Sequence, residues 1–230
     1  MILASHGIIA SSVNSSTLIN GLISAYNADN STVDSYGSYN GVAVGGLTYA
    51  TGKFGDSFQF NGTNSYVSLP NITNQLNFTS DFSVSLWVNF NSVEAPYEVL
   101  FSNYKSGTPF GTGFQIYLDI TGLKLELYNN SAGNCFLSTF SPTINTWYHL
   151  VATRKSSTES KMYINNVSQN GSYPSGNQTT NQTYQTGQQY NIGASLGATF
   201  SNIRMDSINI YNRVLTSTEV SELYTKQYPF

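Results

Sequence analysis

Residues 82–90, FSVSLWVNF, alternate strictly between large apolar and small or polar side chains. Successive side chains of a β-strand point to opposite faces, so this stretch predicts a long strand with one face on a core. A helix would spread the same apolar residues around its whole circumference. The apolar set is Phe82, Val84, Leu86, Val88 and Phe90, and the opposite set is Ser83, Ser85, Trp87 and Asn89.

The same alternation recurs along most of the chain, with Gly, Asn or Ser at each break. It is found in SFQFNG, SYVSLP, GFQIYLDI, GLKLELYNN, WYHLVATRK and KMYINNV. Charged residues make up only 9% of the chain and aromatic residues 14%, a composition that favours strands and turns over helices. Many short strands in 230 residues predict one all-β domain, a sandwich or a barrel.

The stretch MDSINIYNRVLTSTEV, residues 205–220, predicts a strand that runs into a short helix. Thr216 is a candidate N-cap and Glu219 follows at the spacing of a capping box, so we expect a helix of about two turns. If the alternation of the strand is regular, Asp206 shares a face with Ile208 and Ile210. A carboxylate aimed at a core needs a compensating partner, either hydrogen-bond donors or a metal ion.

Several segments resemble, in the family's order, the laminin G-type domains of the concanavalin A-like family. They are TGKFGDSFQFNGTNSYVSLP, DFSVSLWVNF, WYHLVATRKSSTESKMYINNV, NIGAS and MDSINIYNRVLTSTEVSELY, within about residues 20–226. The resemblance implies an all-β, two-sheet antiparallel jelly-roll sandwich with one short C-terminal helix, formed by residues 20–230. Residues 1–19 are then a lead-in segment, a candidate docking or oligomerisation arm. Where the family has an Asp-Gly turn this chain has Asn165 and Asn166, which also permit a tight turn.

The resemblance also implies a calcium ion near a sheet edge and glycan binding on the concave face or rim loops. Residues 27–41, NADNSTVDSYGSYNG, supply the carboxylate, amide and carbonyl oxygens that Ca²⁺ requires. We therefore expect a structural Ca²⁺ held by Asp34, Asp206 and an oxygen of Asn40. The alternative is that Asp206 accepts hydrogen bonds from backbone amides of a neighbouring loop, or pairs with Arg204 or Arg213, without a metal.

Residues with catalytic potential are few. The nearest carboxylate pairs are Asp119 with Glu126 and Glu94 with Glu98, and neither has the spacing of glycosidases on this fold. His149 has no Ser or Cys at a motif spacing and is predicted to be a hydrogen-bonded structural residue. The single cysteine, Cys135, is expected to be a small buried side chain. We expect a protein that is not an enzyme, with a glycoside hydrolase-like activity as a distant alternative.

Binding is better supported, because aromatic faces stack on sugars and amides supply adaptable hydrogen bonds. The alternative for each aromatic is packing under a loop. Trp87 stands out because it interrupts a small, polar strand face, whereas Trp147 is predicted to be core. Residues 170–189 are almost free of apolar side chains and predict either a long exposed loop or a locally mobile one. The candidate ligand-binding residues are Trp87, Tyr97, Tyr104, Phe110, Tyr128, Asn129, Asn130 and Asn134.

Lys and Arg are scattered along the chain and the net charge is −3, which argues against nucleic acid as a partner. We also expect no membrane insertion, and we recognise no signal peptide. The initiator Met, low charge and small-residue start favour a virion surface protein, such as a phage head fibre, tail or decoration subunit, that attaches to host surface glycans. A homotrimer suits that role. The alternative is a secreted or cell-surface carbohydrate-binding or adhesion module. The partners are then a surface glycan or other surface proteins.

Overall fold

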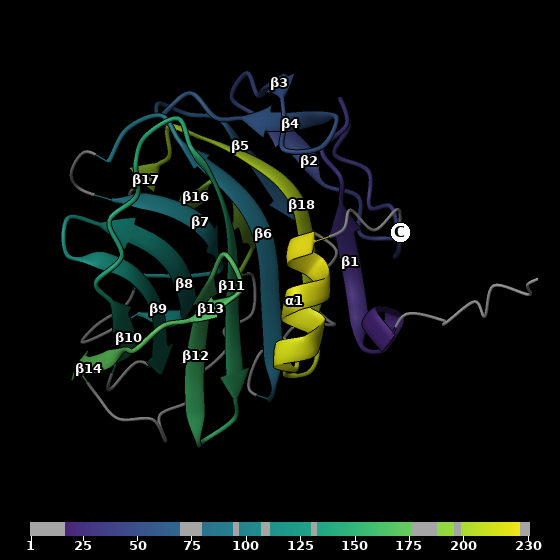
Figure 1. Ribbon diagram of the computed structural model, residues 1–230. Coiled ribbons are helices and arrows are strands. Elements are labelled where there is room, and N and C mark those ends of the chain that lie inside the picture. Colours follow the sequence, from purple (N-terminus) through teal and green to yellow (C-terminus); the bar gives the residue numbers. More distant parts are fainter. Residues whose placement is uncertain are drawn as a thin grey trace, which may run out of the picture.

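The strand predicted at residues 82–90 lies in the middle of one of two sheets that pack face to face (Figure 1). The computed structural model describes residues 17–69, 80–93, 97–106, 111–129, 133–175, 188–195 and 199–225. Within them, all strand pairs in both sheets are antiparallel. This confirms the predicted two-sheet antiparallel sandwich.

The first sheet, sheet A, has the strand order β13-β12-β11-β6-β18-β4-β3, and β1 also pairs with β18. Its three longest strands, β11, β6 and β18, are neighbours in this order (Figure 1). The strands are β1 (Leu22–Tyr26), β3 (Thr48–Thr51), β4 (Asp56–Gln59), β6 (Phe82–Phe90), β11 (Trp147–Lys155), β12 (Glu159–Ile164), β13 (Val167–Ser168) and β18 (Ile203–Tyr211).

The second sheet, sheet B, has the order β14-β10-β9-β8-β7-β15-β5-β2. Its strands are β2 (Val42–Val44), β5 (Tyr66–Leu69), β7 (Glu98–Ser102), β8 (Thr112–Asp119), β9 (Gly122–Asn129), β10 (Gly133–Ser138), β14 (Ser172–Ser175) and β15 (Tyr190–Ile192). A small separate pair is formed by β16 (Ala194–Ser195) and β17 (Thr199–Phe200). Part of the predicted loop at 170–189 is therefore strand β14, and residues 176–187 lie outside the described residues.

The core lies between the two sheets and is built by the alternating apolar residues. Sheet A contributes the predicted row of β6, from Phe82 to Phe90, and sheet B contributes Phe114 from β8 and Leu125 from β9. The ring centroids of Phe82 and Phe114 lie 5.3 Å apart across the interface. Each buried side chain of this size contributes about 1.5–3 kcal/mol to stability, so the core is the main source of the fold's free energy.

Helix α1 (Ser217–Thr225) covers the outer face of sheet A and begins at the predicted capping box (Figure 1). The Thr216 hydroxyl accepts from the Glu219 backbone amide at 3.3 Å, and Glu219 Oε2 accepts from the Thr216 amide at 2.9 Å. Val220 and Leu223 pack onto the sheet together with Leu18. Leu18 lies in η1 (Thr17–Ile19) and is fully buried, so the packed fold includes residues that the sequence assigned to the lead-in segment.

The hairpin between β12 and β13 turns at Asn165 and Asn166, both of which have positive φ, at 49° and 67°. Two consecutive positive φ angles match the right-handed twist of the adjoining strands, and Asn tolerates them better than most residues with a side chain. The expected tight turn is confirmed.

Candidate functional site

Asp206 lies on the outer face of sheet A, so the expectation that it faces the core with Ile208 and Ile210 is wrong. The register of β18 against β6 shifts between Asp206 and Asn209, and Ser207 has a φ of 49°. A β-bulge of this kind inserts one extra residue and reverses the alternation after it. Ile208 and Ile210 belong to the core cluster, whereas Asp206 stands opposite Trp87.

The carboxylate of Asp206 is fully buried and anchors the loop that precedes β4. Its Oδ2 accepts from the Phe54 backbone amide at 2.8 Å, and its Oδ1 accepts from the Ser207 hydroxyl at 3.0 Å. Burial raises the pKa of Asp206 to about 6, the backbone and hydroxyl donors oppose that rise, and the charge of Asp29 adds to it. The hydrogen bond to a loop amide is the arrangement weighed as the alternative to a metal.

The suggested arginine partners of Asp206 are used elsewhere. Arg204 donates to the carbonyl of Thr51 at 3.1 Å, and Arg213 forms an ion pair with Glu219 at 2.7 Å. Neither arginine therefore compensates Asp206.

Asp34 and Asn40 belong to a different network from Asp206. Asp34 Oδ1 accepts from the backbone amides of Ala25, Tyr36 and Gly37, and its Oδ2 accepts from that of Tyr39. The Asn40 amide oxygen accepts from the Asp34 backbone amide at 3.1 Å. With four backbone donors, the carboxylate of Asp34 has little lone-pair capacity left for a cation.

The carboxylate that lies near Asp206 is Asp29, not Asp34. A Cβ on Gly52 would meet Asp206 Oδ2 at 2.6 Å, and a Cβ on Gly55 would meet Asp29 Oδ1 at 2.1 Å, so the short loop between these glycines contacts both carboxylates. Among the residues that the structure describes, no three His, Cys, Asp or Glu side chains gather where a metal could bind. Of the predicted ligand set, Asp34 and Asn40 are joined by a hydrogen bond to each other, and Asp206 makes its own hydrogen bonds with Phe54 and Ser207.

Trp87 is covered by helix α1, which corrects its placement among the ligand-binding residues. It is 4% exposed, and its ring stacks on Tyr224 with 5.7 Å between centroids and 17° between planes. His149 and Phe54 pack against it at 5.2 Å and 5.9 Å, and Lys53 Nζ lies 4.4 Å from its ring centroid. The indole thus fastens α1 and the 52–56 loop to the sheet.

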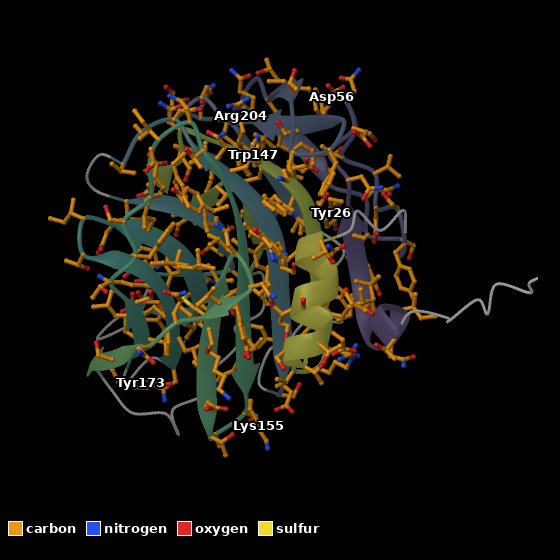
Figure 2. The ribbon with its side chains drawn as sticks, viewed as in Figure 1. Tyr26, Asp56, Trp147, Lys155, Tyr173 and Arg204 are labelled. Carbon is orange, nitrogen blue, oxygen red and sulfur yellow. The ribbon has the colours of Figure 1, made fainter. Side chains whose placement is uncertain are left out.

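His149 and Trp147 are neighbours of Trp87 on the same outer face. His149 is 1% exposed and its Nε2 lies 2.9 Å from the Ser85 hydroxyl, which confirms the predicted hydrogen-bonded histidine, and burial lowers its pKa to about 3. Trp147 is half-buried with the Arg204 guanidinium 5.6 Å above its ring (Figure 2), so the prediction that Trp147 is core is wrong. It follows β11's alternation, which places the core residues at Leu150 and Ala152.

Two pairs of tyrosines lie on the face of sheet B that points away from the core. Tyr104 packs against Tyr128 with ring centroids 4.6 Å apart, and Tyr97 packs against Tyr117 at 5.1 Å. Tyr97, Tyr104 and Tyr128 are half-buried, so part of each ring reaches the surface. Three predicted residues from two separate sequence loops are therefore brought onto one face, and Tyr104 meets Tyr128 directly.

Glu126 lies between the two pairs and joins them. Its Oε2 accepts from the Tyr117 hydroxyl at 2.6 Å, and it also interacts with the Tyr128 hydroxyl. Burial and, after it, the charge of Glu126 raise the pKa of both tyrosines, so both hydroxyls stay protonated. The side chain of Gln115 donates to Tyr128 at 3.4 Å. The result is a carboxylate held by tyrosine hydroxyls between aromatic rings.

A row of polar side chains crosses sheet B through this cluster. In register, Cys135 lies opposite Glu126, Glu126 opposite Gln115, Gln115 opposite Ser102, and Ser102 opposite Asn191. Gln115 and Asn191 are 4% and 2% exposed, and Gln115 Oε1 and Asn191 Oδ1 have no hydrogen-bond donor within the described structure. Buried acceptors of this kind call for a donor from water or from a ligand.

Cys135 is buried at the end of that row, as predicted. It is 3% exposed, and burial together with the charge of Glu126 raises the pKa of its thiol to about 12. A neutral thiol is a poor nucleophile.

Asp119 and Glu98, from the two carboxylate pairs considered for catalysis, make structural contacts. Asp119 forms an ion pair with Lys124, and Glu98 accepts from the Ser92 hydroxyl and the Asn202 amide. Glu94 lies outside the described residues.

The remaining predicted ligand residues are only partly placed. Asn129 is half-buried at the end of β9, opposite Thr112, and of Asn134 only the backbone is described, in β10. Phe110 and Asn130 lie outside the described residues. The residues that sequence reasoning missed are Gln115 and Tyr117 and the central role of Glu126. The alternation of GFQIYLDI and GLKLELYNN already puts Gln115, Tyr117, Lys124, Glu126 and Tyr128 on one face.

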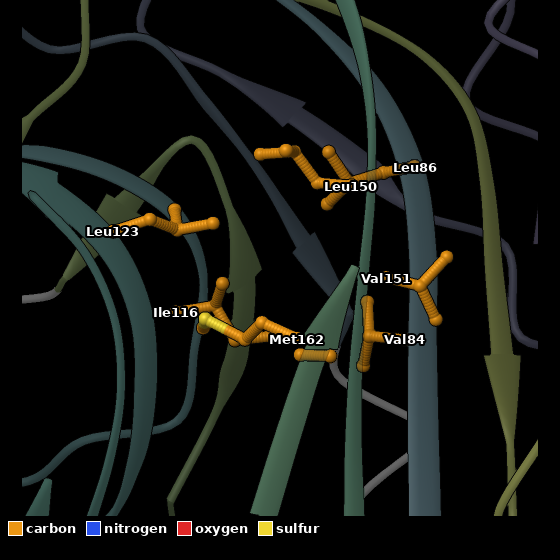
Figure 3. Close-up of a pocket in the computed structure, with 8 residues that line it drawn as sticks. Val84, Leu86, Ile116, Leu123, Leu150, Val151 and Met162 are labelled. Carbon is orange, nitrogen blue, oxygen red and sulfur yellow. The ribbon is translucent and has the colours of Figure 1, made fainter. Parts of the chain in front are cut away.

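Three cavities in the described part of the chain are lined by other residues than the predicted ligand residues. A void of ≈ 10 Å³ between the sheets is lined only by apolar residues such as Val84, Ile116 and Met162, and has room for about one water molecule (Figure 3). A surface groove of ≈ 240 Å³ lies beside Lys155 and Tyr163, and another of ≈ 250 Å³ beside Ile120 and Phe140. Neither groove contains one of the predicted ligand residues.

Comparison with known proteins places the chain by fold. A family model described as the concanavalin A-like lectin/glucanases superfamily matches residues 61–221. No curated protein matches the chain in sequence.

Similar solved structures include domain 4 of AbnA, a GH43 extracellular arabinanase from Geobacillus stearothermophilus, in complex with arabinotriose. It is 21% identical with a TM-score of 0.69, and the match covers 89% of this chain and 98% of that one. The receptor-binding domain of botulinum neurotoxin C/D mosaic serotype is 15% identical with a TM-score of 0.67, over 89% and 51% of the two chains. The binding domain of Paraclostridial mosquitocidal protein 1 is 18% identical with a TM-score of 0.65, over 90% and 52%. The chain spans about half the length of these two toxin domains.

Proposed function

The chain belongs to the concanavalin A-like lectin/glucanase superfamily, and from this premise we propose that it is a non-catalytic glycan-binding module. The observation that carries the proposal is the face of sheet B where Glu126 interacts with Tyr117 and Tyr128, each packed against a second tyrosine, Tyr97 and Tyr104. We call this set the tyrosine face. Tyrosine rings offer flat apolar surface for sugar rings at a small entropy cost, and a carboxylate accepts from sugar hydroxyls.

The similar structures support the proposal at the level of fold. One of them is a domain in complex with arabinotriose, and two others are a receptor-binding domain and a binding domain of toxins. These likenesses lie below 25% identity, so the ligand must be argued from the tyrosine face itself.

Glycan binding is tested by applying the purified chain to an array of neutral and acidic oligosaccharides that includes arabinotriose. We expect binding with micromolar to millimolar dissociation constants to at least one glycan class, because a shallow aromatic face buries little area. A folded protein that binds no glycan at millimolar concentration would refute the proposal.

The absence of catalysis is the second part of the proposal. Asp119 is paired with Lys124, and Glu126 accepts from a tyrosine hydroxyl, so neither carboxylate is placed as a free acid beside a second carboxylate. Incubation with the array's best oligosaccharide, followed by chromatography, should return the substrate intact. Shortened products that disappear in Glu126→Gln would contradict this part and favour a glycoside hydrolase-like activity.

Calcium remains a proposal, with Asp29 in place of Asp34 beside Asp206. Asp34 does not fit because backbone amides occupy both of its oxygens. Asp29, which follows β1, and Asp206 in β18 both contact the loop between Gly52 and Gly55. Asp206 is fully buried, and a divalent cation would relieve the cost of burying its charge. We expect the melting temperature to rise with Ca²⁺ over EDTA in the wild type and not in Asp29→Asn. Identical melting temperatures of the wild type with and without Ca²⁺ would refute the proposed calcium binding.

We also propose that the chain acts at the surface of a virion, as a phage head fibre, tail or decoration protein that attaches to host glycans. The support is the low charge and the Asn-, Ser-, Thr- and Tyr-rich composition. Flanking capsid or tail genes and a trimeric mass in solution would agree with this role. A flanking glycan-utilisation locus and a monomeric mass would favour a secreted or cell-surface adhesion module. No helix within the described residues has the length and apolarity needed to cross a membrane.

A further inference from the structure

We propose that the tyrosine face selects uncharged, hydroxyl-rich glycans and excludes acidic ones that carry carboxylate or sulfate groups. The inference rests on the proposed glycan binding and names the chemical class of the ligand.

The first argument is the position of Glu126. It stands at the centre of the face, half-buried, between Gln115 on β8 and Cys135 on β10. The Tyr117 hydroxyl donates a hydrogen bond to this carboxylate, so that donor is already used. A ligand carboxylate placed on the tyrosine rings would lie within a few ångströms of a like charge, in surroundings less polar than water.

The second argument is that the lysine closest to Glu126 in the face is already paired. Lys124 lies two positions before Glu126 on β9 and forms an ion pair with Asp119, with both side chains mostly buried. Its ammonium also lies 5.5 Å from the ring centroid of Tyr117. A ligand acid would have to break this pair to gain a counter-charge. Lys105, next to Tyr104 in the chain, is exposed to solvent, where salt and water screen it.

The third argument is the excess of acceptors along the polar row. Gln115 Oε1 and Asn191 Oδ1 lack a donor within the described structure, and the Glu126 carboxylate accepts as well. Gln115 Oε1 and Asn191 Oδ1 are themselves buried, so a sugar hydroxyl reaches the row at the half-buried carboxylate of Glu126, to which it can donate directly or through water. Carboxylate and sulfate groups are hydrogen-bond acceptors only, so they cannot donate to the acceptor oxygens of this row.

The experiment compares matched sugars that differ in charge. Isothermal titration would measure lactose against 3′-sialyllactose and galactotriose against trigalacturonic acid, together with the array's best neutral ligand. We expect the acidic member of each pair to bind at least about tenfold more weakly, from a like charge at roughly 6 Å. Acidic members that bind as tightly as their neutral counterparts would overturn the selectivity while leaving glycan binding in place. A folded protein that binds none of the sugars would instead overturn the proposed function.

Two variants and one control test which residues set the ratio of acidic to neutral glycan affinity. Glu126→Gln should weaken the neutral ligand about tenfold and bring the acidic-to-neutral affinity ratio close to one. Asp119→Asn, which frees Lys124 from its pair, should strengthen the acidic ligands by several-fold. Glu222→Gln removes the same charge from helix α1 on the other sheet and should leave the ratio unchanged. A ratio unaffected by Glu126→Gln and Asp119→Asn in folded protein would show that the face does not set it.

Discussion

The ion pair at the start of helix α1 makes a quantitative prediction for the variant Glu219→Gln. Burial works against ionisation of Glu219, but the hydrogen bonds from Arg213 and Thr216 outweigh it and lower the pKa to about 2. The ordinary value is 4.5, and one pKa unit corresponds to about 1.4 kcal/mol. The depression is therefore worth about 3 kcal/mol at neutral pH, and about 2 kcal/mol after allowance for the exposure of Arg213.

The sign of the pH dependence follows from the lowered pKa. The stabilisation by Glu219 is fully present above the unfolded pKa of about 4.5 and is lost as pH falls from there toward 2. Urea unfolding at pH 7 should give a free energy about 2 kcal/mol lower for Glu219→Gln than for wild type. By pH 3.5 that difference should shrink by roughly two fifths, because the carboxyl group of the unfolded chain is then mostly protonated while that of the folded chain is still mostly ionised.

The matched control is Glu222→Gln, three residues later on the same helix, whose side chain has no ion pair among the described residues. It should unfold like the wild type at every pH. A Glu219→Gln difference that stays constant from pH 7 to pH 3.5, or that Glu222→Gln reproduces, would refute the reasoning from the capping box and the Arg213 pair.

Three further predictions concern buried groups. Trp87→Ala should lower the free energy of unfolding by about 3–5 kcal/mol, measured in urea, because the indole fastens both α1 and the 52–56 loop, and a cost below 1 kcal/mol would contradict that role. Asp34→Asn should cost about 3 kcal/mol, equally in Ca²⁺ and in EDTA, since it weakens four charge-assisted hydrogen bonds to backbone amides, and a loss confined to Ca²⁺ would restore Asp34 as a metal ligand. Cys135 should react with a thiol reagent only after unfolding, and rapid labelling of the native protein at pH 8 would contradict its burial and raised pKa.

The features predicted correctly from the sequence are those that depend on local pattern. The alternation of residues 82–90 sets which side chains of β6 face the core, and the spacing of Thr216 and Glu219 sets the start of α1. The tight turn at Asn165 and Asn166 is local for the same reason. Each of these depends on neighbours within a few positions, where backbone geometry leaves little choice.

The errors lie where distant segments decide the outcome. The side of sheet A on which Asp206 lies depends on one bulge at Ser207, and serine carries no signal for a positive φ. The sequence near Trp87 predicts an aromatic side chain on an otherwise polar strand face. In the structure α1, more than 120 positions later in the chain, covers it. Trp147, predicted to be core, is half-buried on the outer face, where the alternation of β11 with Leu150 and Ala152 places it.

The tyrosine face depends both on local sequence pattern and on contacts between distant segments. Tyr104 and Tyr128 could be proposed from the character of their loops, but their contact depends on how β7, β8 and β9 align. Glu126 was present in the alternation of its strand, yet a single carboxylate on an outer strand position normally indicates a solvated side chain. Only the two neighbouring tyrosine hydroxyls distinguish it from that ordinary case.

The most direct test of the glycan-binding account is the dissociation constant of the array's best neutral oligosaccharide for Tyr128→Ala. The matched control is Tyr163→Ala, which changes a half-buried tyrosine of β12 in sheet A that packs against the apolar cluster containing Val220 and Leu223 of α1. If sugars stack on the tyrosine face, Tyr128→Ala should weaken binding about tenfold or more while Tyr163→Ala stays within about twofold of wild type. Equal affinity of Tyr128→Ala and wild type, with both variants folded, would contradict the account and move the binding site away from sheet B.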